Sequence, residues 1–167
     1  MAVEDDSGEP ADFETWYRRA HPRLGTALSL AFGDRDLAQD AADEAVARAY
    51  ERWHDVSTMA SPDGWLYRVA FNVARRRLRR RSLEARLLRR GRPEHAAPPA
   101  GELWLVVAEL PERQRLAVVL RHVGQLTEPE IAEIMGVARG TVSSTLRTAH
   151  RSLRDRLADT TVGREAR

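Results

Sequence analysis

The sequence predicts an all-α protein made of two small helical domains joined by a flexible linker, the C-terminal one a helix-turn-helix. Three observations support this fold class. Apolar residues recur at helical spacing along most of the chain. Residues 91–101 contain three prolines and two glycines, which cannot hold a helix and therefore indicate a linker. Within residues 126–154, two short amphipathic segments are separated by a glycine, which is the pattern of a helix-turn-helix.

The composition indicates a cytoplasmic protein with an acidic region and a basic region, which are expected to bind different partners. There is no cysteine, which excludes disulfides and cysteine metal sites. The acidic start is unlike that of a signal peptide, and the longest apolar run, residues 103–108, is too short to span a bilayer. Residues 1–60 hold six arginines against thirteen acidic residues, whereas residues 61–93 hold eleven arginines against two. Such asymmetry favours two different partners.

The first domain is expected over residues 12–90, after a disordered acidic tail at residues 1–11. Its first helix is predicted over Phe13–Phe32 and should be kinked or interrupted by Pro22. A second helix is predicted from about Asp36 to Trp53.

The outer face of this second helix carries charged residues, namely Asp40, Asp43, Glu44 and Arg48. Clustered carboxylates can bind a divalent metal, but no histidine stands at ligand spacing. We therefore expect no metal here, and a solvated face is the simplest interpretation.

A third helix is predicted from Pro62 to about Arg90, after a loop over His54–Gly64, with Ser61 as its N-cap. Its buried side is expected to contain Leu66, Val69, Ala70 and Val73. The opposite stripe contains Arg68, Asn72, Arg75 and Arg79, with Arg76 beside it and Trp65 at its edge. Seven more arginines lie along or after it, namely Arg77, Arg80, Arg81, Arg86, Arg89, Arg90 and Arg92.

So many like charges repel one another along a helix, which suggests that a polyanion neutralises them. A basic solvated face is the alternative. A membrane surface is disfavoured because the apolar side of the helix is needed for the core. Trp65 suits a core position as well as a base-stacking position.

The second domain is expected over residues 102–158, followed by a frayed tail at residues 159–167. Two supporting helices are marked by Trp104, Val107 and Leu110, then by Leu116, Val119 and Leu120. The helix-turn-helix follows. Thr127 and Glu130 form a capping box at its first helix, which Gly136 ends.

The second helix of the motif begins near Arg139 and should bury Val142, Leu146, Ala149 and Leu153. Its DNA-binding candidates are small, polar or basic: Arg139, Gly140, Thr141, Ser143, Ser144, Arg147, Arg151 and Arg154. Arginine can bond bidentately to guanine, and we expect this of Arg147, with Arg151 and Arg154 on phosphates. An ordinary helical hairpin with solvated arginines is the alternative.

Several segments, in this order, resemble bacterial RNA polymerase sigma factors of the extracytoplasmic-function group. The segments are LAQDAADEAVARAYERW, GWLYRVAFNVARRRLRRR, LPERQRLAVVLRHVGQLTEPEIA and EIAEIMGVARGTVSSTLRTAHRSLR. In that family the first is a region 2 helix that docks on the clamp helices of the largest catalytic subunit. The second melts and holds the −10 promoter element, and the last, in region 4, reads the −35 element.

The resemblance implies a protein that binds core RNA polymerase (its beta-prime and beta subunits) and promoter DNA, with no cofactor and no enzymatic activity. It implies polymerase-binding roles for Asp40, Asp43, Glu44, Arg48 and Trp53. It implies −10 contacts by Trp65, Arg68, Asn72, Arg75, Arg76 and Arg79. Many members are sequestered by an anti-sigma factor, although no residue here indicates a site for one.

The sequence departs from the family pattern within the last segment. Ser143, Thr145 and Thr148 stand where family members usually have basic residues. Fewer cations should weaken phosphate contact and make its salt dependence shallower.

Two other functions are alternatives to this one. A free-standing helix-turn-helix regulator would bind duplex DNA without polymerase, more often as a dimer on a palindrome. An enzyme is disfavoured because the five histidines lack metal spacing, and no nucleophile turn or phosphate-cradling glycine loop is present.

Overall fold

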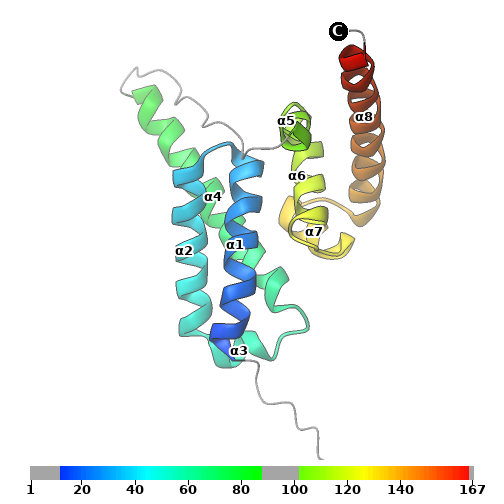
Figure 1. Ribbon diagram of the computed structural model, residues 1–167. Helices are drawn as coiled ribbons and strands as arrows, with labels where there is room; N and C mark the ends of the chain where they lie inside the picture. The colour runs from blue at the N-terminus through cyan, green and yellow to red at the C-terminus, as the bar shows by residue number, and fades with distance from the viewer. Residues whose placement is uncertain (1–11, 88–101, 166–167) are drawn as a thin grey trace, which may run out of the picture.

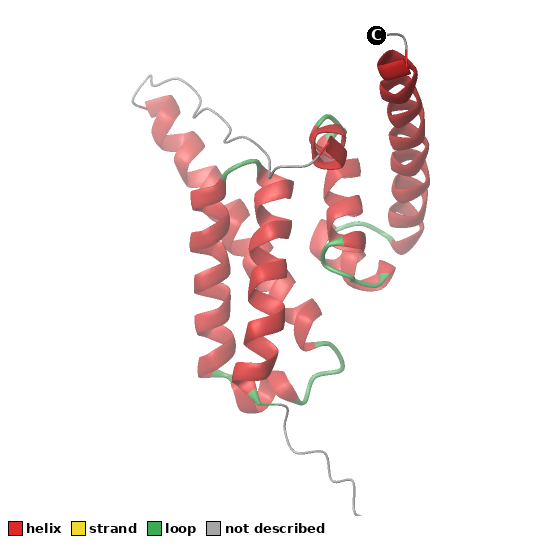
Figure 2. Ribbon diagram, viewed as in Figure 1, coloured by secondary structure: helices red, strands yellow, loops and turns green. Residues whose placement is uncertain are grey.

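The computed structural model describes residues 12–87 and 102–165, and the tail and linker expected at residues 1–11 and 91–101 lie outside these residues. The described residues contain eight α-helices and no strand (Figures 1 and 2). The all-α fold class is therefore confirmed. In this part of the chain, no helix combines the length and apolarity needed to cross a membrane.

The N-terminal half consists of α1 (Phe13–Phe32), α2 (Arg35–Glu51), α3 (Trp53–Ser57) and α4 (Pro62–Leu87). Helices α1 and α2 lie side by side, and α4 packs across both (Figure 1). The side chain of Asp12 accepts hydrogen bonds from the first N–H groups of α1, and Gly33 ends this helix with a φ of 66°.

We expected Pro22 to kink or interrupt α1, and the helix runs through Pro22 without interruption. A proline removes one N–H donor, but Leu24 and Leu28 are fully buried just beyond it. Their packing stabilises the helix across the missing hydrogen bond.

The predicted loop at residues 54–64 was partly wrong, because α3 occupies its first residues and α2 ends two residues earlier than expected. Val56 is fully buried, and the Trp53 ring packs against Trp16. Tertiary burial thus induces a helical turn that the local sequence does not signal.

The C-terminal half consists of α5 (Glu102–Ala108), α6 (Glu112–His122), α7 (Glu128–Met135) and α8 (Arg139–Glu165). Helices α7 and α8 form the predicted helix-turn-helix. The Glu130 carboxylate accepts hydrogen bonds from the backbone N–H and hydroxyl of Thr127 at 2.7 and 2.6 Å. Gly136 ends α7 with a φ of 67°.

Fraying was expected from residue 159, but the backbone of α8 is helical through Glu165. Extending a helix adds one hydrogen bond per residue without a new nucleus. Within α8, Arg156 also bonds Glu109 at the end of α5, which ties this end of the helix to its neighbour.

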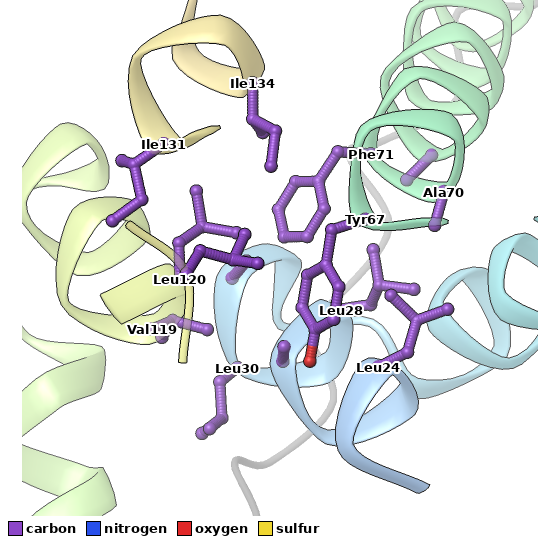
Figure 3. Close-up of a cluster of buried hydrophobic side chains, with 14 of the residues drawn as sticks. Leu24, Leu28, Leu30, Tyr67, Ala70, Phe71, Val119, Leu120, Ile131 and Ile134 are labelled. Atoms are coloured by element: carbon purple, nitrogen blue, oxygen red, sulfur yellow. The ribbon is translucent and has the colours of Figure 1, made fainter. Parts of the chain in front are cut away.

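One hydrophobic core joins the two halves (Figure 3). Leu24 and Leu28 of α1 and Tyr67 and Phe71 of α4 meet side chains of the C-terminal half. Those partners are Leu120 of α6 and Ile131 and Ile134 of α7. The sequence pattern identified the side of α4 that faces α1 and α2 but missed Tyr67 and Phe71, because their burial depends on the second half.

Candidate nucleic-acid interface

The outward face of α8 presents three arginines to solvent. Arg147, Arg151 and Arg154 are exposed, and none of them forms a hydrogen bond or ion pair with the described residues. Val142, Leu146 and Ala149 on the opposite side are buried, as predicted. The apolar stripe therefore fixes the helix on its support and leaves the cations available to an anion such as DNA.

Two other candidates on α8 already have partners in α7. The Ser143 hydroxyl donates to the Glu128 carboxylate at 2.6 Å, and Arg139 Nε lies 3.4 Å from the same oxygen. The hydrogen bond from Ser143 is the main cause of the lowered pKa of Glu128. These contacts fix the angle between the two helices of the motif.

The hydroxyl groups along α8 are also used within the helix. Ser144 and Thr145 donate to the carbonyl of Thr141 at 2.9 and 2.7 Å, and Thr148 donates to the carbonyl of Ser144 at 3.0 Å. Such back-bonding satisfies the hydroxyls locally. Gly140 and Thr141, at the start of the helix, remain exposed.

The candidate residues of α4 divide into two groups, and together we call them the α4 stripe: Trp65, Arg68, Asn72, Arg75, Arg76 and Arg79. Asn72, Arg76 and Arg79 are exposed to solvent. The other three lie next to α7: Arg68, which is also exposed, pairs with Glu133 at 3.1 Å, and the half-buried Arg75 donates to the Ile134 carbonyl at 2.6 Å. Trp65 is half-buried and lines a cleft with Glu130 and Glu133.

The acidic face of α2 is partly neutralised from within the protein. Arg77 of α4 donates to Asp40 at 2.5 Å and to Glu44 at 2.8 Å, and Arg48 donates to Glu44 at 2.5 Å. The Arg77 hydrogen bond is the main cause of the lowered pKa of Glu44. Arg81 similarly bonds Asp34, at 2.8 Å.

These ion pairs correct the expectation that all the α4 arginines await a polyanion. Carboxylates of α2 and of its N-cap Asp34 already neutralise Arg77 and Arg81, whereas Arg76 and Arg79 remain solvent-exposed. The sequence offered no signal for this pairing because it joins residues more than 30 positions apart.

The remaining polymerase-binding candidates have different surroundings. Asp43 is exposed and accepts hydrogen bonds from His21 at 3.0 Å and Gln39 at 2.9 Å. Burial favours a higher pKa for Asp43, but these hydrogen bonds outweigh it and lower the pKa. Trp53 lies in an aromatic cluster, with its ring centroid 4.8 Å from that of Trp16 and 5.2 Å from that of Phe13.

Sequence reasoning also missed a histidine pair. The Nε2 atoms of His122 in α6 and His150 in α8 lie 2.9 Å apart. Within the described residues no cluster of three or more histidine, aspartate, glutamate or cysteine side chains could hold a metal ion. The pair therefore stands as a contact between two helices of the C-terminal half.

Comparisons with known proteins match both halves of the chain to one family. The model for sigma-70 region 2 matches residues 16–84, and the model for sigma-70 region 4 matches residues 100–153. The RNA polymerase sigma-E factor of Streptomyces coelicolor is 34% identical over 157 residues, which cover 90% of this chain and 88% of that protein. The ECF RNA polymerase sigma factor SigW of Bacillus subtilis is 26% identical over 147 residues, covering 76% and 79%.

A solved structure has the same fold. It is the sigma factor RpoE in complex with the anti-sigma factor NepR from Bartonella quintana, with a TM-score of 0.71 at 20% identity. The match covers 88% of this chain and 97% of that one.

The arrangement of an arginine-rich helical half and a helix-turn-helix half is that of a transcription initiation factor. The chain belongs to the extracytoplasmic-function group of the sigma-70 family of RNA polymerase sigma factors. Its function is promoter-directed initiation of transcription, and a free-standing regulator is not favoured.

Proposed function

We propose that three surfaces, one on each of three helices, have separate roles in the initiation of transcription. The acidic face of α2 binds core RNA polymerase, the α4 stripe holds the −10 element, and the outward face of α8 reads the −35 element. The observation that carries this assignment is the presence of two separate sets of exposed arginines: Arg76 and Arg79 on α4, and Arg147, Arg151 and Arg154 on α8. Both sets lie opposite apolar faces that are buried.

On α8, we infer that Arg147 reads a base edge and that Arg151 and Arg154 bind phosphates. The hydroxyls of Ser143, Thr145 and Thr148 already have partners within the protein. Three arginines are thus the main source of charge on this face. A face with few cations releases few counterions, so binding should depend only moderately on salt.

On α4, we infer that Arg76 and Arg79 grip the backbone of the unpaired strand, with Asn72, Arg68 and Arg75 beside them. Trp65 is half-buried and supplies a flat ring for stacking. Opening DNA without ATP requires capture of the unstacked strand, which a cationic groove with an aromatic edge provides.

On α2, we infer that Asp43 is the most available acid, since Asp40 and Glu44 share Arg77. Arg48 orients Glu44, and Trp53 supports the end of α2 from the aromatic cluster. The polymerase supplies the chemistry, so we propose that the chain has no enzymatic activity and no cofactor, and that it acts in the cytoplasm. The structural relative was solved with an anti-sigma factor, and we propose a partner of that kind here.

Run-off transcription with purified bacterial core polymerase tests this proposal. Fragmented DNA from the source genome serves as template, with and without the protein. We expect discrete transcripts that appear only with the protein. Tight duplex binding without any transcript would contradict the proposal and favour a regulator that works without polymerase.

A further inference from the structure

One carboxylate of α7 holds two side chains at the start of α8. Glu128 Oε2 accepts a hydrogen bond from the Ser143 hydroxyl at 2.6 Å and one from Arg139 Nε at 3.4 Å. We propose that Glu128 is a positioning residue that sets base specificity: it orients Arg139 to read one base pair of the −35 element and keeps this arginine off the phosphates. This inference rests on the proposed role of the outward face of α8.

Arg139 has the position of a base-reading residue. It is the first residue of α8, and in a helix-turn-helix the N-terminal residues of the second helix contact base edges. Its side chain is 73% exposed despite the contact with Glu128. Gly140 follows it, and a Cβ atom added there would meet nothing within 4 Å. The first turn of α8 is therefore open enough for a base pair to approach closely.

The way in which Arg139 is held suits a bond to guanine. Bidentate bonding to guanine needs two neighbouring N–H donors directed at O6 and N7. Arg139 Nε already donates to Glu128, and among the described residues Nη1 and Nη2 form no hydrogen bond, so they are available as a pair. An arginine that is held in one orientation also loses less side-chain entropy when it binds DNA.

The Ser143 hydroxyl fixes the carboxylate in place. Its hydrogen bond is the shorter of the two, and it is the main cause of the lowered pKa of Glu128, which is therefore charged at neutral pH. Ser143 lies four residues after Arg139, on the same side of α8. Glu128 thus bridges two successive turns of α8, and it cannot follow the arginine freely toward solvent.

The charge of Glu128 also opposes a non-specific contact. An unpaired arginine at the start of α8 would bind any phosphate within reach. The Glu128 carboxylate beside Arg139 repels a phosphate, whereas the neutral O6 and N7 atoms of guanine meet no such repulsion. Glu128 should therefore lower the affinity for unrelated DNA and raise the preference for one base pair.

A double-mutant cycle in the full-length chain tests this role. The probe is a fluorescent duplex that the parent selects from a randomised library, with and without core polymerase, and the competitors are duplexes with one base pair changed at a time. The variants are E128Q, R139A and E128Q/R139A. The matched control is E112Q, since Glu112 is also an acid in the first turn of a helix, α6, and among the described residues it forms no hydrogen bond with α8.

We expect R139A to lose about tenfold of the discrimination at one base pair, and E128Q about three- to fivefold at the same base pair. E128Q should bind unrelated duplexes as tightly as the parent or up to about twofold more tightly, because one repulsive charge is removed. In the R139A background, E128Q should change that discrimination no further, because Glu128 acts through Arg139. E112Q should match the parent.

A loss of affinity in E128Q that is equal at every base pair would mean that Glu128 only stabilises the motif, and it would overturn the inference. Additive losses in E128Q/R139A, or a base preference that R139A leaves intact, would overturn it too. In these cases the parent still selects a −35 sequence, and the proposed function stands. If the parent selects no sequence, alone or with core polymerase, the proposed reading of the −35 element fails and the inference fails with it.

Discussion

At the scale of single residues, Tyr67 carries a polar group in an unfavourable environment. Its hydroxyl is buried without a partner among the described residues, and burial raises its pKa well above the ordinary value. Tyr67→Phe removes the hydroxyl and keeps the ring. We expect the free energy of unfolding to rise by about 1 kcal/mol or to stay unchanged.

Urea denaturation of the parent and the variant measures this change. Tyr17→Phe, on the partly exposed side of α1, is the matched control. A loss of more than about 1 kcal/mol in Tyr67→Phe would mean that the hydroxyl has a partner.

Arg147 is the residue on which base reading should depend most. Arg147→Ala should weaken binding of the −35 duplex by about 1–3 kcal/mol and relax its sequence preference. Arg113→Ala, which removes an exposed arginine from α6, should leave both unchanged. Competition binding with point-substituted duplexes measures both quantities, and an unaltered preference would mean that another face of α8 reads the bases.

At the scale of elements, Arg77 joins α2 to α4 by two carboxylates. These ion pairs are partly exposed to solvent, so they stabilise the folded protein only modestly. Arg77→Met should lower the free energy of unfolding by about 0.5–1 kcal/mol, because Asp40 and Glu44 lose their shared cation.

The matched control is Arg80→Met, since among the described residues Arg80 pairs only with Glu84 on its own helix, and it is highly exposed. It should cost about 0.3 kcal/mol or less. Equal losses in the two variants, measured by urea denaturation, would show that the bridge between α2 and α4 adds nothing beyond an ordinary surface arginine.

The histidine pair between α6 and α8 should make the free energy of unfolding depend on pH. The pKa of His122 is lowered by burial first, and then by the charges of His150 and Arg121. The unfolded chain, with an ordinary pKa of about 6.5, therefore takes up a proton more readily than the folded one. The free energy of unfolding should be constant above that pH and fall as the pH drops below it.

Denaturation midpoints between pH 5 and about 8 measure this effect. His122→Gln should flatten the dependence, whereas His54→Gln, at an exposed position in α3, should keep it. A profile that His122→Gln does not alter would assign the pH dependence to other groups.

Individual elements were predictable where local chemistry decides them. The capping box at Thr127 and Glu130 and the left-handed turn at Gly136 were confirmed, because a cap needs only neighbouring residues. Helix α3 and the continuity of α1 through Pro22 were not predictable, since distant side chains stabilise them. The assignment of each candidate residue to polymerase, the −10 element or the −35 element stays a prediction.

At the scale of the whole molecule, the shared core has a thermodynamic consequence. The two halves should unfold in one cooperative transition, because Tyr67 and Phe71 of one half pack on Leu120 and Ile134 of the other. E133Q/I134A should broaden this transition or split it in two. Calorimetry measures this as the ratio of the calorimetric to the van't Hoff enthalpy. A ratio of about 1 in parent and variant alike would mean that interface strength does not control cooperativity.

The sequence by itself determined the all-α class, the helix-turn-helix and the family, because periodicity, caps and motifs are local patterns. It also placed Arg147, Arg151 and Arg154 opposite an apolar stripe, since helical geometry fixes which residues share a face. Only the tertiary structure decided that Arg77 is paired with α2, and that Arg68 and Arg75 bond to α7. Those contacts join residues far apart in the chain, and they depend on how two apolar faces pack, which no local pattern specifies.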